Sequence, residues 1–413
     1  MMKLLFLSNF YPPYELGGME QLTSEVRGRL QERGHQVSVL TSRAGLAQGK
    51  PKRDGTIRSL YLEADIHYYR MTDFFLARRR QDAANSHELR RAVDIVQPDV
   101  FVVWNMWNLS RNLPYWAEQL LPNRVAYYIA STWPMDLTMH EEYWNLPAGH
   151  GLSETAKRPL RAVALAQMRR EGYPPKLAFA HSRCVSRYMR DKLVAASAIP
   201  PTAGVLYNGI DPAPFLCAPS SKISLEGAPL RLLYFGSLLP IKGVHVAIEA
   251  LGTLARQGLA ERVVLTILGR GHPDYVASLV GQVKDLNLQS RVHFEEWIDR
   301  ADIPAMLQRH DVFLFTSTGP EAMARTVIEA MAAGLVVIGS EVGGQVEMLV
   351  NGENALTFEA GDAVGLANQI AYVLDEPELR LRLVQAGRNQ VLERFTLERM
   401  VDNMETWLGS IVQ

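Results

Sequence analysis

The chain has 413 residues, of which 47% are hydrophobic and 21% are charged, and its formal net charge is −1. This length suits two domains of roughly 150–200 residues better than a single core. The near-neutral charge gives no reason to expect nucleic acid as a partner. Cys184 and Cys217 lack metal-ligand spacing, which argues against a disulfide framework or a zinc site and fits a reducing cytoplasm.

The N-terminus reads MMKLLFLSNFYPPYE, and its apolar stretch is too short for a signal peptide. We expect a buried first strand there, at Lys3–Ser8. No stretch of the sequence approaches the ~20 apolar residues that a membrane-spanning helix needs. The sequence therefore predicts a cytoplasmic protein that at most contacts the inner face of a membrane peripherally.

Short apolar segments alternate with segments of helical periodicity, which is typical of repeated βαβ units and parallel sheets. In the first unit, a helix at Met19–Arg33 follows the first strand, Gly34 ends that helix, and VSVLT forms the next strand. Later strands of the first half are expected at Val100–Trp104, Arg124–Ile129, Lys176–Ala180 and Val205–Tyr207.

The second half repeats this alternation and ends in a helical stretch, Glu376–Leu408. Its strands are expected at Arg231–Phe235, Val263–Leu268, Val292–Phe294, Val312–Phe315, Leu335–Gly339 and Ala355–Phe358. A linker rich in Pro, Ser and Gly separates the halves at 211–227. The sequence thus predicts an α/β fold of two Rossmann-like, doubly wound domains, over 1–215 and 228–395, with a last helix over 396–413. Ligands of such open sheets bind at the carboxyl ends of the strands, so we expect the site in a central cleft that both domains face.

Two carboxylates stand in the stretch GPEAMARTVIEAMAAG (319–334), between the strands VFLF and LVVIG. Glu321 precedes a helix expected at Arg325–Ala333, and Glu329 lies within it. A carboxylate can accept hydrogen bonds from both hydroxyls of a ribose, and amides at a helix N-terminus can bind a diphosphate without a metal. For an isolated pair, a solvated glutamate and a partner of the helix dipole would be the simpler explanation. Their place at a strand end in a two-domain α/β chain favours a binding site.

This stretch resembles the Glu-x7-Glu motif of the retaining glycosyltransferases of family 4, which have the GT-B fold. The resemblance extends over nearly the whole chain and is strongest over 230–356. It implies that Glu321 contacts the donor sugar as a catalytic residue and that Glu329 binds the ribose. Ala324 stands where glycine is usual, and alanine restricts φ more than glycine does. The donor-binding residues implied around them are Met323, Ala324, Arg325 and Thr326.

The segment YFGSLLPIKG (234–243) resembles the phosphate-binding turn of the family. The resemblance implies that Lys242 is a catalytic residue that neutralises the donor diphosphate. Gly236 and Ser237 belong to the same donor-binding turn. Ser237 replaces the usual arginine, and we expect Arg270, at the end of a neighbouring strand, to supply the missing charge. A solvated loop arginine is the simpler alternative.

Two further segments resemble donor-binding parts of the family. EEWID (295–299) resembles the segment that recognises the base, which implies Trp297 and Ile298 there, although a core or rim tryptophan is an equal alternative. Gly17 and Gly18 match the glycine loop near the donor phosphate and the acceptor; without the family they would be a helix-entry turn. EVGGQVEML and LYNGID resemble turns of the family that we interpret as architectural.

The phrase YYIASTWPMD departs from the family, which often has a histidine and an aspartate where Ala130 and Ser131 stand. Together with Trp133 we expect them on the acceptor side. Alanine cannot make the hydrogen bond of that histidine to the donor sugar. Ser131, Thr132 or the more distant His140 could compensate for it, although a lone histidine in an irregular stretch such as His140 is more often a surface residue. These departures keep open a second function, a catalytically silent nucleotide-sugar-binding or scaffolding protein.

The resemblance implies that the chain, as an enzyme, is a hexosyltransferase that uses a UDP-, GDP- or ADP-linked sugar and retains the anomeric configuration. Its acceptor would be a glycan, a lipid-linked molecule or a small molecule. The sequence has no D-x-D motif, so we expect no metal and no cofactor besides the donor. It also has no G-x-G-x-x-G after a first strand, which argues against a dinucleotide oxidoreductase.

Two smaller expectations concern the remaining segments. The resemblance implies that the last helix crosses back to the first domain. The run FFLARRRQ (74–81) joins aromatic residues to three arginines, as in segments that contact anionic lipid head groups. A solvated helix face is the simpler explanation of so short a run.

Overall fold

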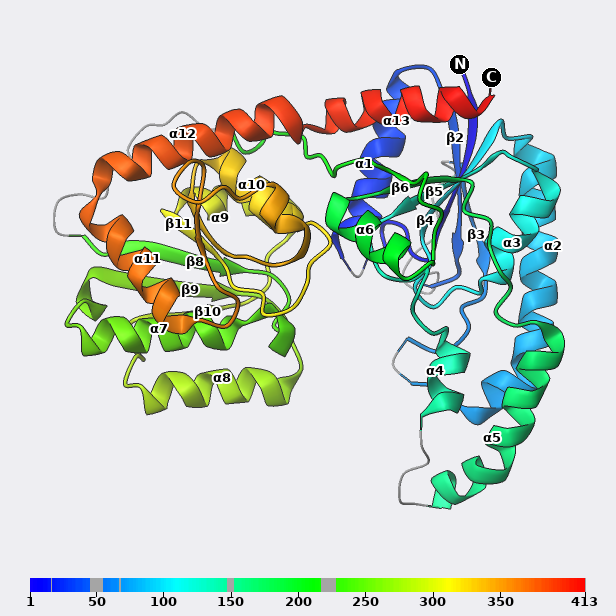
Figure 1. Cartoon of the computed structure of the whole chain (residues 1–413), viewed down its shortest axis with the longest axis horizontal. Coiled ribbons are helices and arrows are strands. Elements are labelled where there is room, and N and C mark those ends of the chain that lie inside the picture. Colours follow the sequence, from blue (N-terminus) through cyan, green and yellow to red (C-terminus); the bar gives the residue numbers. More distant parts are fainter. Residues whose placement is uncertain (16, 45–54, 67, 147–151, 217–227, 413) are drawn as a thin grey trace. The chain divides into compact units, whose positions relative to one another are not determined.

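The chain divides into two units in a computed structural model that describes residues 1–15, 17–44, 55–66, 68–146, 152–216 and 228–412. We call the group of Met1–Val185, Met189–Leu206 and Val401–Gln413 unit 1. The group of Ser186–Tyr188 and Tyr207–Met400 is unit 2 (Figure 1). Each unit is built on one parallel sheet.

The sheet of unit 1 has seven strands in the order β3-β2-β1-β4-β5-β6-β7, all paired in parallel. They are β1 (Lys3–Ser8), β2 (Gln36–Ser42), β3 (Thr56–Leu60), β4 (Val100–Asn105), β5 (Val125–Ile129), β6 (His181–Cys184) and β7 (Gly204–Val205). The direction of strand order reverses between β1 and β4. A crevice forms beside the carboxyl ends of the strands at such a reversal, and ligands bind there.

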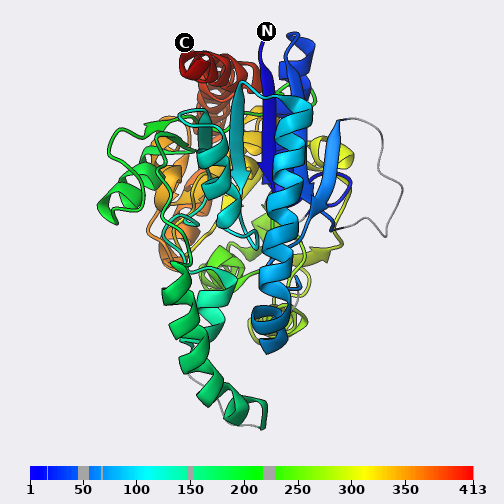
Figure 2. The same ribbon diagram turned by 90° about the vertical axis from the view of Figure 1, so that its right-hand side faces the viewer.

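Helices cover the unit 1 sheet, and Figure 2 shows α2 lying across one of its faces. The helical segments in the first half of the chain are α1 (Gly18–Glu32), η2 (Asp73–Ala77), α2 (Arg78–Val96), α3 (Asn112–Leu120), α4 (Met139–Asn145), α5 (Leu152–Glu171) and α6 (Arg187–Ala195). The last helix, α13 (Leu397–Val412), begins in unit 2, and its larger part belongs to unit 1. In unit 1, Glu405 of α13 accepts a hydrogen bond of 2.9 Å from Arg33.

The sheet of unit 2 has six parallel strands in the order β10-β9-β8-β11-β12-β13. They are β8 (Leu230–Phe235), β9 (Val263–Leu268), β10 (Val292–Glu295), β11 (Val312–Phe315), β12 (Val336–Ser340) and β13 (Leu356–Phe358). Figure 1 shows α7 (Val244–Arg256), α8 (Pro273–Asp285) and α11 (Ala363–Asp375) on one side of this sheet, and α9 (Ile303–Gln308) and α10 (Arg325–Ala333) on the other. The remaining segments are η3 (Pro240–Lys242), η4 (Ala260–Arg262), η5 (Arg300–Asp302), η6 (Gly343–Glu347) and α12 (Pro377–Arg394).

The strands of unit 2 are apolar on both faces because helices cover both. Leu232, Leu265 and Ile338 are fully buried in the same cluster as Ile248 of α7 and Ile370 of α11. Each fully buried side chain of this kind contributes roughly 1.5–3 kcal/mol relative to an exposed one. This burial explains why the sequence shows continuous apolar runs here instead of alternation.

Most of the expected strands are confirmed to within one or two residues, but the strand expected at Lys176–Ala180 is wrong. The strand there is β6, which begins at His181. Backbone amides of Ala178 and Phe179 instead donate to the carboxylate of Glu118, and Phe179 has a left-handed φ of 49°. The strand β3 and the helices α4 and α5 were not predicted from the sequence. The expected linker, 211–227, lies largely outside the described residues.

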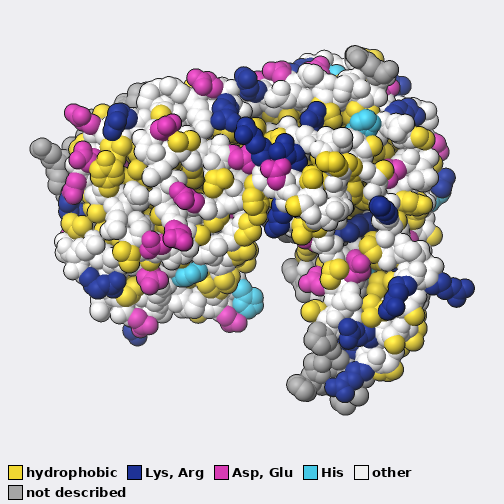
Figure 3. Space-filling model, viewed as in Figure 1, with side chains coloured by type: hydrophobic (Ala, Val, Ile, Leu, Met, Phe, Trp, Pro, Cys, Tyr) yellow, Lys and Arg dark blue, Asp and Glu magenta, His cyan; other side chains and the backbone are white. Residues whose placement is uncertain are grey.

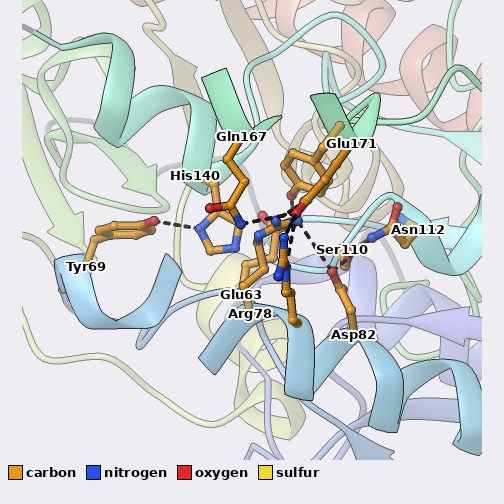
Figure 4. Close-up of polar contacts among 11 residues, drawn as sticks. Glu63, Tyr69, Arg78, Asp82, Ser110, Asn112, His140, Gln167 and Glu171 are labelled. Carbon is orange, nitrogen blue, oxygen red and sulfur yellow. Dashed lines mark hydrogen bonds and ion pairs between the residues drawn. The ribbon is translucent and has the colours of Figure 1, made fainter. Parts of the chain in front are cut away.

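A buried polar cluster lies where η2, α2, α4 and α5 meet in unit 1, and Figure 4 shows it. His140 is fully buried there, so the expectation of a surface residue is wrong. The ring nitrogen Nδ1 of His140 lies 2.6 Å from the hydroxyl of Tyr69. Burial lowers the pKa of His140 to about 3 and therefore keeps the ring neutral.

Part of the segment FFLARRRQ belongs to the same buried cluster. Phe74 and Arg78 are buried, and the Arg78 guanidinium pairs with Glu171 and lies 4.8 Å from the centre of the Phe74 ring. Of the aromatic and basic residues in that run, Arg79 and Arg80 are exposed. Figure 3 shows Lys, Arg and hydrophobic side chains on the surface over α4 and α5. Within the described residues, no helix is both long and apolar enough to span a membrane.

Glu63 makes the stability of this cluster depend on pH. Burial raises the pKa of Glu63 from 4.5 to about 8, and the hydroxyl of Tyr173 bonds to its carboxyl group. Between these two pH values the folded chain binds one proton more than the unfolded chain does. The free energy of unfolding therefore falls as the pH rises through this window, by at most about 1.4 kcal/mol per unit.

We expect the substitution Glu63→Gln to remove the pH dependence of the free energy of unfolding that Glu63 causes. Urea unfolding of the wild type and of Glu63→Gln at pH 6, 7 and 8.5 should show the variant gaining stability relative to the wild type as the pH rises. Glu142→Gln, on the exposed face of α4, is the matched control and should run parallel to the wild type. A constant difference between Glu63→Gln and the wild type would contradict the assignment.

Candidate donor-binding site

The loops after β8, β9 and β11 lie together at one edge of the unit 2 sheet. The amide of Leu238 donates to the carbonyl of Arg270 over 2.7 Å, and the amide of Thr318 donates to the carbonyl of Ile241 over 2.9 Å. These bonds join the turn after β8 to both neighbouring loops because β8 lies between β9 and β11. The parallel arrangement of the sheet thus brings the three expected phosphate- and sugar-binding segments to one place.

Lys242 and Glu321, both singled out from the sequence, form an ion pair at this edge. The hydroxyl of Ser317 also donates to Glu321, at 2.9 Å from Oε1. Lys242 is held at the end of η3, where its carbonyl accepts a hydrogen bond of 3.0 Å from the Thr316 hydroxyl. In this state each charge has its partner, and an anionic ligand would compete with Glu321 for the ammonium group.

A glycine turn positions the backbone of Glu321. The amide of Gly344 donates to the carbonyl of Glu321 over 2.8 Å. Gly343 has a left-handed φ of 56°, and a Cβ there would stand 2.1 Å from the Glu321 oxygen. Only glycine fits at this approach. The interpretation of EVGGQVEML as an architectural turn therefore has a structural reason.

Glu329 is buried in the middle of α10, with 1% of its surface exposed. Its Oε1 accepts a hydrogen bond of 2.5 Å from Arg300. Its Oε2 is buried and has no hydrogen-bond partner among the described residues. The structure thus excludes the simpler explanation of a solvated helix residue. Arg300 was not predicted as a site residue, because nothing in the sequence marks a pair of residues that lie on different elements and are 29 positions apart.

No side chain caps the start of α10, so no capping side chain accepts a hydrogen bond from the first backbone amides of this helix. Ala324 has φ −80° and ψ 120°, an ordinary extended conformation, so its methyl group causes no backbone strain where the family usually has glycine. The side-chain amide of Asn208, from LYNGID, donates to the carbonyl of buried Met323. Arg325 and Thr326 form the half-buried first turn.

The remaining unit 2 residues lie around the same edge. Trp297 is 40% exposed and its ring lies 5.8 Å from that of buried Phe235, at the end of β8. Ile298, which follows Trp297, is half-buried. The side chain of Arg270 is exposed, and the backbone pairing between Leu238 and Gly271 brings its loop beside Gly236 and Ser237.

In unit 1, the Gly17–Gly18 turn begins α1 beside the reversal of strand order. The amide of Gly17 donates to Glu20 over 3.0 Å, and Glu20 accepts a second hydrogen bond, of 3.3 Å, from Asn105 at the end of β4. Glu20 is buried, and that burial raises its pKa. The glycine turn is therefore attached to the carboxyl end of the sheet.

The residues expected on the acceptor side follow β5, and they differ in exposure. Ala130 is half-buried and Ser131 is exposed. Trp133 is 7% exposed and packs against Phe179, with ring centres 5.4 Å apart. Trp133 thus belongs to the interior, as Trp104 and Trp144 do. Among the described residues, no group of three His, Cys, Asp or Glu side chains could hold a metal ion.

Two parallel α/β units with strand-end loops of this kind define the GT-B fold. Solved structures of similar fold cover the whole chain: HepE of Anabaena in complex with UDP (TM-score 0.69, 20% identity, 99% of this chain and 100% of that one) and sucrose-phosphate synthase of Thermosynechococcus elongatus (TM-score 0.70, 17% identity, 100% and 99%).

Sequence comparisons add the family. Residues 16–214 match the model "Glycosyltransferase Family 4", and residues 220–390 match "Glycosyl transferases group 1". The chain therefore belongs to the GT-B glycosyltransferases of the family 4 type.

Curated relatives include glycogen synthase of Mycobacterium tuberculosis, 32% identical over 192 residues, 46% of this chain and 44% of the relative. The N-acetyl-alpha-D-glucosaminyl L-malate synthase of Bacillus anthracis is 29% identical over 175 residues, 42% and 44%. The matched region spans less than half the length of either relative.

Substituting Gly343 tests whether its turn holds Glu321. We expect Gly343→Ala to lower the free energy of unfolding by roughly 1–3 kcal/mol, because the added methyl group meets the Glu321 carbonyl and the left-handed φ disfavours alanine. Gly281→Ala, in α8, is the matched control: a Cβ there meets nothing within 4 Å, and alanine favours a helix by about 0.5–1 kcal/mol. Equal urea midpoints for the two variants would show that the turn is not constrained.

Proposed function

We propose that this protein transfers a sugar from a nucleoside diphosphate to an acceptor hydroxyl with retention of configuration, and that unit 2 binds the donor. The observation that carries the proposal is the carboxylate of Glu329. One of its oxygens is held by Arg300 and the other has no partner among the described residues. An unsatisfied buried acceptor costs about 1–3 kcal/mol, so a donor group such as a ribose hydroxyl would stabilise it.

The charges at this sheet edge suit a departing diphosphate. Lys242 would move from Glu321 to the phosphate oxygens, and the uncapped amides at the start of α10 would add hydrogen-bond donors. Arg270 would supply the second positive charge that Ser237 does not. Freed from Lys242, Glu321 would accept hydrogen bonds from the donor sugar. Stabilising the leaving group in this way is the main electrostatic requirement of the transfer.

The relatives support a nucleotide sugar as donor and leave several classes of acceptor. The solved structures of HepE carry UDP, UDP with glucose, and UDP-glucose. A UDP-linked sugar is therefore the first donor to test here, before GDP- and ADP-linked sugars. We assign no metal to the reaction, because Lys242 and the α10 amides can carry the charge of the diphosphate.

Binding of nucleoside diphosphates tests the donor site. We expect one of UDP, GDP or ADP, and not NAD, to raise the thermal midpoint and to give a calorimetric isotherm. Glu329→Gln should weaken that ligand about tenfold or more, because the amide cannot accept two ribose hydrogen bonds and keep its Arg300 partner. Glu249→Gln, on the exposed face of α7, is the control and should bind as the wild type does. Binding of none of the three, or of NAD, would contradict the proposal.

Turnover separates an enzyme from the silent binding protein of the same fold. With the nucleotide sugar whose diphosphate binds, we expect donor consumption that EDTA does not reduce, and a product whose anomeric proton shows the configuration of the donor. Lys242→Ala should lower the rate by roughly 10²–10³, which is the usual cost of removing one hydrogen-bond donor that stabilises charge in the transition state. Tight donor binding without hydrolysis or transfer would instead favour the silent protein.

A further inference from the structure

A polar cavity lies at the carboxyl edge of the unit 1 sheet, and neither the glycine turn nor Ala130 and Ser131 line it. It has a volume of about 350 Å³. Arg43 follows β2 and Tyr61 follows β3, so the ends of two neighbouring parallel strands form one side of it. Tyr68 and Arg70, before η2, form another side. None of these residues has a part in the donor site.

Two arginines of this cavity lie against tyrosine rings. The Arg43 guanidinium is 4.2 Å from the centre of the Tyr61 ring and donates to its hydroxyl over 2.6 Å. The Arg70 guanidinium is 4.5 Å from the Tyr68 ring and donates to the Tyr68 hydroxyl over 2.7 Å. The ring contact and the hydrogen bond together restrain each guanidinium, so that less side-chain entropy is lost when a ligand binds. Tyr68 is also half exposed and offers an aromatic surface.

The charges of the cavity balance. Arg43 and Arg70 are matched by Asp65 and Asp73, which also line it. Glu63, at the junction with the buried polar cluster of Figure 4, is largely uncharged at pH 7 because burial raises its pKa to about 8. A phosphate would face two carboxylates and an ammonium group would face two guanidiniums. This arrangement favours an uncharged ligand with many hydrogen-bonding groups.

The cavity also has fixed walls and an unused acceptor. Asn108 holds the loop after β3 through two hydrogen bonds with Ala64, of 3.0 and 2.8 Å. In a third bond, of 3.0 Å, the amide of Glu63 donates to the backbone carbonyl of Asn108. Gln81, which lines the cavity, has a buried Oε1 with no hydrogen-bond partner among the described residues. A preformed site that lacks one hydrogen-bond donor is ready for a ligand that supplies it.

The geometry points to a binding site for a sugar residue of the acceptor, so that the acceptor is a glycan or glycoside. Planar carboxylates, amides and guanidiniums can each hold two neighbouring hydroxyls, and a tyrosine ring can pack on the apolar face of a pyranose. The volume lies at the small end of the range for ligand pockets, about 300–1,000 Å³, which suits a monosaccharide unit. This inference rests on the proposed transferase function, but the cavity and the donor site are made of different residues.

Saturation-transfer NMR with the full-length chain tests the inference. The probes are the methyl α-pyranosides of glucose, galactose, mannose and N-acetylglucosamine, and inorganic phosphate is added as a competitor. We expect a saturation signal from at least one glycoside, no displacement by phosphate, and at least a tenfold weaker apparent affinity in Tyr68→Ala and in Arg70→Ala. Tyr115→Ala, an exposed tyrosine of α3 outside the cavity, is the matched control and should behave as the wild type.

Each other result overturns the assignment. No signal from any glycoside, an unchanged signal in both cavity variants, or an equal loss in Tyr115→Ala would place no sugar in this cavity. Displacement by phosphate would show an anion site instead. Nucleoside diphosphate binding, measured on the same variants, should stay at the wild-type level. Its absence in the wild type would contradict the donor site while leaving the glycoside result to decide the cavity.

Discussion

Every described strand in both sheets runs parallel to its neighbours, and the chemistry of this chain depends on that constraint. Parallel strands all end at the same edge, so segments far apart in sequence meet there. The turn before Lys242 and the loop that carries Glu321 are brought together because β8 and β11 are adjacent. The same rule places Arg43 beside Tyr61 in unit 1, after β2 and β3.

The parallel sheet also explains why the site lowers stability. Helices cover both faces of the sheet, so one side of each helix is buried against the strands. Glu329 lies in such a helix, and a buried carboxylate is tolerated only with a partner. Arg300 supplies one, and the second oxygen is left without a partner among the described residues. A fold that keeps a carboxylate oxygen in its interior without a hydrogen-bond partner gives up stability for it, which is the physical reason to look for the ligand that supplies the missing donor.

The sequence predicted the fold more fully than the site. Apolar runs and helix stops located most strands within a residue or two, because burial on both faces leaves a continuous signal. The strand expected at Lys176–Ala180 failed because Glu118, distant in sequence, takes the backbone amides of that segment. Arg300 and the buried His140 were missed for the same reason: the partner of each comes from another element, and a single sequence contains no record of such pairs. At Ala324, the sequence suggested a constraint that the structure does not show. Alanine stands there in place of the usual glycine, but the observed φ is one that alanine adopts freely.

The polar interior of unit 1 links stability to recognition. The Glu63 carboxyl is shared between the buried cluster and the cavity beside Tyr61, so the burial that keeps it protonated also removes a negative charge from the cavity wall. If Glu63 were ionised, the wall would carry three carboxylates against two guanidiniums, and the balance that suits an uncharged ligand would be lost. The hydroxyl of Tyr173, on the loop after α5, bonds to the Glu63 carboxyl group, and the backbone amide of Glu63 donates to the carbonyl of Asn108. Two further bonds between Asn108 and Ala64 hold the neighbouring residue. The helices that surround the cluster therefore do more than cover the sheet: they set the charge of the surface that the ligand would meet.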